Sequence, residues 1–216
     1  MRITHLGHSC LLVEAADQRI LVDPGRFSHG FEELTALDAV LITHEHQDHL
    51  DAERLPTLLE ANDAARLLAE PETAVQLTEG GLDAERLHVG DPVSFAGLTV
   101  TPLGGEHATV HPEIPVIGNV GLLFETDGEP RLFVPGDSYA VVPERVDLLA
   151  LPLMAPWSSG AMTVDFARAV GAPVLIPVHD ELVSPLGRGL LTGLVGRMTP
   201  ESQRLVDLKG AGPTEF

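Results

Sequence analysis

The stretch Thr43-His44-Glu45-His46-Gln47-Asp48-His49-Leu50-Asp51 decides the fold, and it directly follows a short apolar run. It places four side chains that can bind a metal within six residues: His44, His46, Asp48 and His49. Imidazole nitrogens suit zinc and similar transition metals, and a carboxylate adds a harder oxygen ligand. A loop that leaves a strand can turn such side chains toward one point. The density of ligands favours a metal site over a polar loop that carries histidines by chance.

Two ligands for each ion do not make a stable site, so further ligands are expected elsewhere in the chain. Three later apolar segments, each typical of a strand, are followed by a ligand-type residue: His107, Asp137 and His179. Taken singly, each of these residues has an ordinary explanation as a surface or turn residue. Their repetition at the ends of apolar strands favours one shared site.

The rest of the chain has no internal repeat, low-complexity tract or long linker. Periodicity and turn residues predict strands at 3–14, 19–22, 39–43, 86–89, 92–95, 98–102, 120–125, 131–134, 147–151, 174–178 and 204–208. They predict helices at 50–62, 71–78, 163–170 and 186–198. Strands dominate each half and helices follow them, which predicts an α+β fold of two β-sheets packed face to face with helices outside. The length suits one domain over residues 1–216.

Charge and composition limit the partners. The 216 residues carry a net charge of −19, with only 13 Lys and Arg, which argues against a nucleic-acid partner. No apolar run is long enough to span a bilayer, and the N-terminus lacks the layout of a signal peptide. The single cysteine, Cys10, permits no internal disulfide and is expected to be small and buried. A cytoplasmic protein without a membrane partner is therefore expected.

The motif H-x-H-x-D-H at residues 44–49, with the three later ligands, resembles the metallo-β-lactamase superfamily of metal-dependent hydrolases. The resemblance covers about residues 3–180. The opening Leu6-Gly7-His8-Ser9 resembles the branch that includes ascorbate-6-phosphate lactonase and many uncharacterised hydrolases. The resemblance implies a four-layer αββα sandwich with the site at one edge of the sheets. Because relatives often form oligomers, a homo-oligomer remains one of the expected states.

The resemblance also implies two divalent transition-metal ions, with zinc first and manganese or iron as alternatives. The implied ligands are His44, His46 and His107 for the first ion, Asp48, His49 and His179 for the second, and Asp137 as a bridge. Asp23 is expected to orient ligands from behind, although an ordinary Asp-Pro turn explains it equally well.

Such a site predicts hydrolysis of a small ester, lactone or phosphoester by a hydroxide that bridges the two metals. Asp48 is expected to orient this nucleophile while it binds metal. His8 and Tyr139 are candidates for the proton donor to the leaving group, because each is close in sequence to a ligand motif. Met154 and Trp157 stand where the resembling branch has smaller residues, and they are expected either to alter substrate choice or to pack the loop against the core.

Two other functions compete with this one. A nuclease or phosphodiesterase acting on nucleic acid is disfavoured by the acidic charge. A metal-binding module without catalysis is disfavoured by the complete ligand set. The substrate is expected to be a small molecule.

Overall fold

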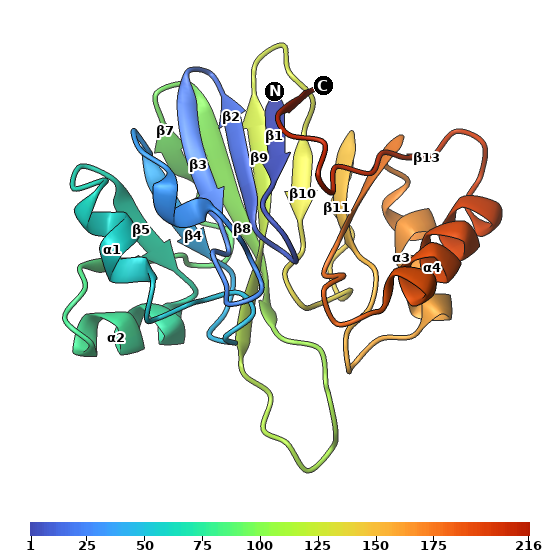
Figure 1. The fold of residues 1–216 in the computed structure, drawn as a ribbon, viewed down its shortest axis with the longest axis horizontal. Coiled ribbons are helices and arrows are strands. Elements are labelled where there is room, and N and C mark those ends of the chain that lie inside the picture. The colour runs from blue at the N-terminus through green and yellow to red at the C-terminus, as the bar shows by residue number, and fades with distance from the viewer.

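The computed structural model describes residues 1–216 and contains two seven-stranded β-sheets packed face to face (Figure 1). The first sheet is built from β1 (Arg2–His5), β2 (Leu11–Ala15), β3 (Gln18–Val22), β4 (Ala39–Ile42), β5 (Arg66–Ala69), β6 (Ala84–Arg86) and β14 (Thr214–Glu215). Its spatial order is β14-β1-β2-β3-β4-β5-β6, so the C-terminal strand pairs with the N-terminal one. The strands β3 to β6 run parallel to one another.

The second sheet is built from β7 (Val93–Phe95), β8 (Leu98–Glu106), β9 (Gly118–Thr126), β10 (Leu132–Val134), β11 (Leu148–Pro152), β12 (Val174–Val178) and β13 (Arg204–Leu205). Its spatial order is the reverse of the chain order, β13-β12-β11-β10-β9-β8-β7. The strands β10 to β13 are parallel, whereas β7 to β10 are antiparallel. Apart from β14, each half of the chain therefore supplies one mixed sheet.

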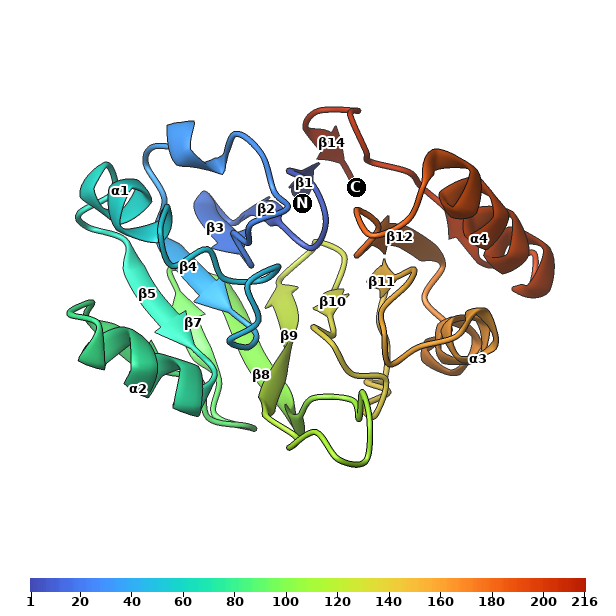
Figure 2. The ribbon, with the colours of Figure 1, turned by 60° about the horizontal axis from the view of Figure 1, so that its bottom comes forward.

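Helices cover the outer face of each sheet (Figure 2). The helices are α1 (Leu55–Glu60), α2 (Pro71–Glu79), α3 (Gly160–Val170) and α4 (Pro185–Met198), and a short 3₁₀ helix lies at Phe31–Glu33. The first two pack on the first sheet and the last two on the second. Ser159 caps the start of α3 by accepting the Met162 N–H, and Gly171 ends it in the left-handed conformation. No helix combines the length and apolar character needed to cross a bilayer.

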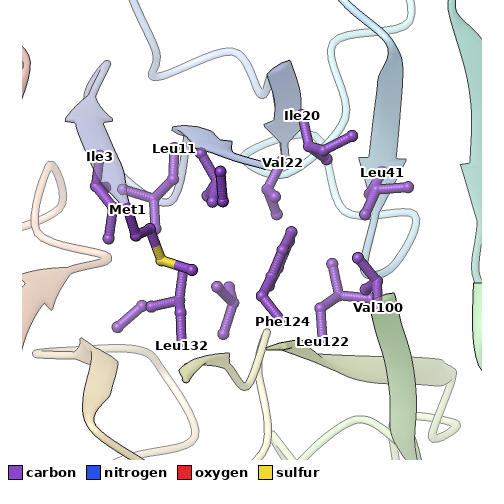
Figure 3. Close-up of a cluster of buried hydrophobic side chains, with 14 of the residues drawn as sticks. Met1, Ile3, Leu11, Ile20, Val22, Leu41, Val100, Leu122, Phe124 and Leu132 are labelled. Carbon is purple, nitrogen blue, oxygen red and sulfur yellow. The ribbon is translucent and has the colours of Figure 1, made fainter. Parts of the chain in front are cut away.

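The main core lies between the two sheets and contains 25 buried residues contributed by both (Figure 3). Strand alternation explains its composition, because successive side chains point to opposite faces. In β2, Leu11 and Val13 face this central core, whereas Leu12 faces the cluster beneath α1 and α2. In β9, Phe124 faces the central core and Leu123 faces the α3 side. Both faces of each sheet are thus buried, which confirms the predicted sandwich with outer helices.

Several predicted boundaries were wrong. The strand at 3–14 is interrupted between β1 and β2, where Gly7 and His8 adopt positive φ angles of 98° and 50°. The helix at 50–62 is limited to α1, because Asp51 instead caps a turn by accepting the N–H groups of Glu53 and Arg54. The strand at 86–89 lies earlier, as β6. Two strands were not predicted. β5 consists of Arg66-Leu67-Leu68-Ala69, which has little strand preference, and β14 has only two residues; they are stabilised by pairing with β4 and β1.

Candidate metal centre

The seven predicted ligands converge at one edge of the sandwich, where several strands end. The His44–His49 segment follows β4, and the later ligands follow β8, β10 and β12. The ligand atoms form two groups, and within each group they lie within 4.8 Å of one another. The first group is His44, His46, His107 and Asp137, and the second is His8, Asp48, His49 and His179. The structure therefore brings together segments that are as many as 171 positions apart in sequence, from His8 to His179.

The first group is built around two histidines of the H-x-H motif. Nε2 of His44 lies 3.1 Å from Nδ1 of His46. The ring of His107 lies edge-on to both, with ring centroids 5.0 Å and 4.7 Å away. Three imidazoles that direct nitrogens at a common point are a typical set of protein ligands for one zinc ion.

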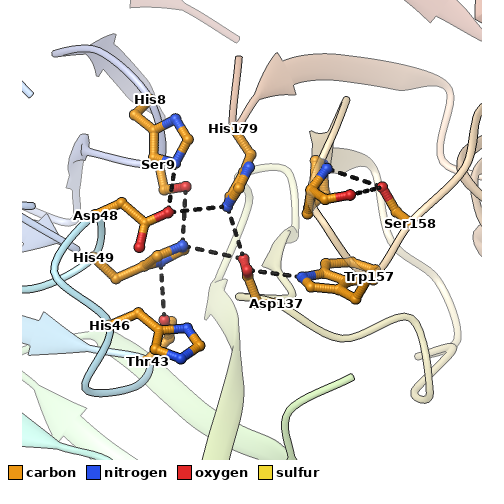
Figure 4. Close-up of polar contacts among 12 residues, drawn as sticks. His8, Ser9, Thr43, His46, Asp48, His49, Asp137, Trp157, Ser158 and His179 are labelled. Atoms are coloured by element: carbon orange, nitrogen blue, oxygen red, sulfur yellow. Dashed lines mark hydrogen bonds and ion pairs between the residues drawn. The ribbon is translucent and has the colours of Figure 1, made fainter. Parts of the chain in front are cut away.

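Asp137 lies between the two groups (Figure 4). Its Oδ1 is 3.1 Å from Nε2 of His49 and 3.3 Å from Nε2 of His179, while its Oδ2 is 3.5 Å from Nε2 of His107. Asp48 approaches the second group from the other side, with Oδ2 3.5 Å from Nε2 of His179. The position of Asp137 is that of a carboxylate able to contact cations in both groups.

Unpaired polar atoms inside this cluster fit a bound cation. Nε2 of His107, Nε2 of His179 and Oδ1 of Asp137 are buried without a hydrogen-bond partner. Both histidines donate their Nδ1–H to a backbone carbonyl, of Ala108 and Met154 respectively, at 2.6 Å. In the neutral rings, Nε2 of His107 and Nε2 of His179 each therefore carry a lone pair that faces the Asp137 carboxylate. Buried acceptors that face one another need a positive charge between them, and a metal ion supplies it.

Asp23 fixes the ligands of the first sheet from behind. It is fully buried and accepts hydrogen bonds from the Thr43 N–H at 2.8 Å, the Thr43 hydroxyl at 2.7 Å and Nδ1 of His49 at 2.7 Å. Because the Thr43 hydroxyl donates to Asp23, it accepts from Nδ1 of His44, 3.0 Å away. Asp23 thus directs the Nε2 lone pairs of both histidines into the cluster.

The electrostatics of the cluster favour a positive charge. Burial lowers the pKa of His49, but the carboxylates of Asp137 and Asp23 outweigh it and hold this pKa well above its usual range. Burial raises the pKa of Asp137, but the facing histidines, His49 foremost, hold it well below its usual range. Burial, followed by the charge of His49, lowers the pKa of His44 well below its usual range. A proton on His49 stands where a metal ion would displace it.

Three residues of the site have strained backbones. His8, Asp23 and His179 have φ angles of 50°, 49° and 55°, in the left-handed region that side chains other than glycine disfavour. The His8 carbonyl accepts the N–H of His179 at 2.8 Å and Nε2–H of His5 at 2.8 Å, which holds two of these residues together. Strain of this kind gathers at functional sites because the surrounding structure imposes it.

His8 joins the second group as a hydrogen-bond donor. Its Nδ1 accepts the backbone N–H of Glu181 at 3.3 Å, which leaves the ring proton on Nε2. That Nε2–H donates to Oδ2 of Asp48 at 3.1 Å. His8 is fully buried, and its ring lies 4.0 Å from that of His179. This arrangement orients Asp48 and engages both ring nitrogens of His8 in hydrogen bonds.

The structure does not place the Tyr139 hydroxyl at the cluster. It donates to the Pro152 carbonyl at 2.6 Å and lies 3.1 Å from the Thr163 hydroxyl. Burial raises the pKa of Tyr139 further above its ordinary value. Its ring stacks on Phe166. The position is that of a packing residue behind the site and not of a proton donor to a leaving group.

Two side chains that hold Asp137 were not predicted in that role: Asn119 was not named, and Trp157 was expected to alter substrate choice or to pack the loop against the core. Asn119 is 1% exposed, and its Oδ1 accepts the Asp137 N–H at 3.0 Å while its Nδ2 donates to the Pro135 carbonyl. Trp157 donates its Nε1–H to Oδ2 of Asp137 at 2.8 Å. A polar residue within the otherwise apolar stretch 117–124 was the available signal for Asn119. Trp157 carried no such signal beyond its unusual size in that loop.

A small cavity of about 30 Å³ opens beside the first group. It is lined by His46, His107 and the segment 108–117, which connects β8 to β9 and forms the long projecting hairpin of Figure 1. Val110, Ile114 and Val116 of this segment are exposed. The surface next to the first group is therefore largely apolar.

Comparison with known proteins agrees with this geometry. Residues 2–179 match the family described as beta-lactamase superfamily domain. Protein Rv0786c of Mycobacterium tuberculosis is 50% identical over 92% of the chain and 93% of its own length. A metal-dependent hydrolase of Alkaliphilus metalliredigens is 29% identical over 83% of the chain and 85% of its own length. The metallo-beta-lactamase fold protein YhfI of Bacillus subtilis is similar in structure, with a TM-score of 0.72 at 18% identity, over 95% of both chains.

Proposed function

Because the chain belongs to the metallo-β-lactamase superfamily of metal-dependent hydrolases, we propose that it hydrolyses a small ester, lactone or phosphoester with a pair of divalent transition-metal ions. Zinc is the first choice, because the site is dominated by imidazole, with manganese and iron as alternatives. The observation that carries the proposal is the set of buried, unpaired acceptor atoms on His107, Asp137 and His179 at the point where the two groups meet.

The ligands divide between two sites in this proposal. His44, His46 and His107 would hold the first ion, Asp48, His49 and His179 would hold the second, and Asp137 would contribute to both sites. When bound, two divalent ions lower the pKa of a shared water toward neutrality and stabilise negative charge on the attacked carbonyl or phosphoryl oxygen.

The protein's own groups hold these ligands in place. Asp23 and the carbonyls that accept from Nδ1 of His107 and His179 place the proton of each neutral imidazole on Nδ1 and direct its Nε2 inward. The Nε2–H of His8 restrains the carboxylate of Asp48, which also lies on the exposed side of the cluster. Asp48 is therefore the ligand best placed to orient an attacking water as well as an ion.

The surroundings of the site favour a small substrate. The cavity at His46 and His107 is narrow, and its wall at 108–117 is apolar. The net charge of −19 disfavours a long polyanion such as RNA or DNA. A compact substrate whose leaving group or acyl group is apolar satisfies both conditions.

Metal analysis joined to a substrate panel tests the proposal. We expect about two equivalents of transition metal per chain, loss of turnover on chelation, and recovery when zinc or manganese is returned. His46→Ala should lose metal and turnover, whereas the matched control His88→Ala, an exposed histidine outside the site, should lose neither. A single ion after saturation would contradict the pair. Two bound ions without turnover of any ester, lactone or phosphoester would indicate a binding module instead.

A further inference from the structure

Trp157 lies in the loop between β11 and α3 and makes a direct hydrogen bond to Asp137. We propose that Trp157 is a positioning residue of the metal centre: its indole N–H holds one oxygen of Asp137 and so directs the other oxygen at the ions. The inference rests on the proposed metal centre and adds to it a residue outside the ligand set.

The indole is fixed in one orientation. Trp157 is 7% exposed, and its ring lies edge-on to Tyr139 with centroids 4.7 Å apart and 6.3 Å from His107. A buried indole N–H requires an acceptor, and Oδ2 of Asp137, at 2.8 Å, is the acceptor it has. Figure 4 shows the ring on the side of Asp137 away from His49. The contact therefore comes from a side chain with little freedom to leave.

The two oxygens of Asp137 are in different environments as a result. Oδ2 receives the indole N–H, whereas Oδ1 receives no hydrogen bond and faces Nε2 of His49 and His179. A carboxylate restrained at one oxygen cannot rotate freely about its terminal bond. Restraint of this kind keeps a ligand close to its binding geometry before the ion arrives, which lowers the ordering cost of binding.

The loop that carries Trp157 is anchored independently of the indole. The Tyr139 hydroxyl donates to the Pro152 carbonyl where the loop begins, and the Ser158 hydroxyl accepts the Ala155 N–H at 2.9 Å. The Met154 carbonyl of the same loop accepts Nδ1–H of His179. Replacing the indole by a phenyl ring therefore removes the N–H and leaves the other anchors in place.

The matched pair Trp157→Phe and Tyr139→Phe separates positioning from loop stability. Trp157→Phe removes the hydrogen bond to Asp137, and Tyr139→Phe removes those to Pro152 and Thr163; both keep an aromatic ring, but only the first touches a ligand. We expect Trp157→Phe to weaken zinc binding about 10- to 100-fold, measured by competition with a coloured chelator. Tyr139→Phe should leave zinc affinity unchanged. Equal weakening by both variants, or by neither, would overturn the inference.

Fluorescence gives a second readout on the unaltered protein, because Trp157 is its single tryptophan. Titration of the metal-free protein with zinc should change the tryptophan emission with the same half-saturation as zinc occupancy. Emission that ignores bound zinc would overturn the inference even if Trp157→Phe fails to fold. A wild-type protein that binds no zinc would instead refute the proposed metal centre, so the two failures are distinguishable.

Discussion

The two sheets hold their ligands by different means. In the first sheet, the ligands lie in one continuous segment, and a single side chain, Asp23, fixes two of its histidines through Nδ1 and Thr43. In the second sheet, the ligands come from three separate loops, and main-chain carbonyls fix His107 and His179. A single substitution at Asp23 should therefore disturb the ligands of the first sheet. The ligands of the second sheet depend instead on the position of the backbone carbonyls that they contact.

The largest effect is expected at Asp137, where the two halves meet. Asp137→Ala should remove at least about one equivalent of metal per chain, because both ions lose a ligand. His8→Ala should retain more metal, because His8 donates to Asp48 and is not itself a ligand in the proposed site. Metal content by plasma mass spectrometry on both variants checks this. Equal losses would mean that the division between ligands and supporting residues is misplaced.

The comparison between side-chain and main-chain support can be tested next. Asp23→Ala leaves two N–H groups and the Thr43 hydroxyl without their buried acceptor. It should weaken metal binding about 10- to 100-fold and reduce the free energy of unfolding by about 3 kcal/mol. Met154→Ala keeps the carbonyl that holds His179 and should leave metal affinity unchanged. Chelator competition and urea unfolding measure the two quantities, and a large effect of Met154→Ala would break the comparison.

Gly25 tests how closely the Asp23 turn must approach the ligand segment. A Cβ at this position would lie 1.8 Å from the carbonyl oxygen of Asp48. Gly25→Ala should therefore displace the turn and cost about 1–3 kcal/mol of stability. In the control Gly189→Ala, within α4, a Cβ meets no atom within 4 Å, and the change should stabilise by up to about 1 kcal/mol. Thermal unfolding of both variants would show opposite shifts, and shifts of the same sign would argue against the close approach.

The smallest effect is expected outside the ligand set, at the ion pair between Arg188 and Asp207. The hydrogen bond from Arg188 lowers the pKa of Asp207, so the pair adds stability above the unfolded pKa and loses it as the pH falls through the lowered value. Because the Asp207 side chain is 49% exposed, Asp207→Asn should cost less than about 1 kcal/mol at neutral pH. Urea unfolding of the wild-type protein and Asp207→Asn at decreasing pH measures the difference between their free energies of unfolding. This difference should vanish on acidification, and a difference that grows would mean that Asp207 is not stabilised as a carboxylate.

The sequence was informative wherever a residue type carries its own chemistry. The His44–His49 motif and the positions of His107, Asp137 and His179 after apolar strands predicted which segments meet, and the structure brings them together. The order of the predicted strands and helices along the chain predicted the sandwich. These features can be read from the sequence because metal-binding chemistry and strand periodicity are properties of the residues themselves.

Other features depend on three-dimensional placement and left no mark in the sequence. The carbonyls that support His107 and His179 belong to Ala108 and Met154, and any residue supplies a carbonyl. Tyr139 was a reasonable candidate by its nearness to Asp137, but the backbone turns its hydroxyl toward Pro152. Trp157 was assigned to substrate choice or packing, and only the fold reveals its bond to Asp137.

The left-handed backbones of His8, Asp23 and His179 matter to anyone who engineers this protein for heat resistance. Glycine adopts that conformation without strain. For other residues, the left-handed conformation has a strain energy on the order of 1–3 kcal/mol. Glycine at position 23 would relieve this strain but would leave the Thr43 and His49 donors without their buried acceptor, so it would cost both stability and support for the ligands. A library should keep the three codons fixed and seek its gains in the outer helices, such as the glycines of α4.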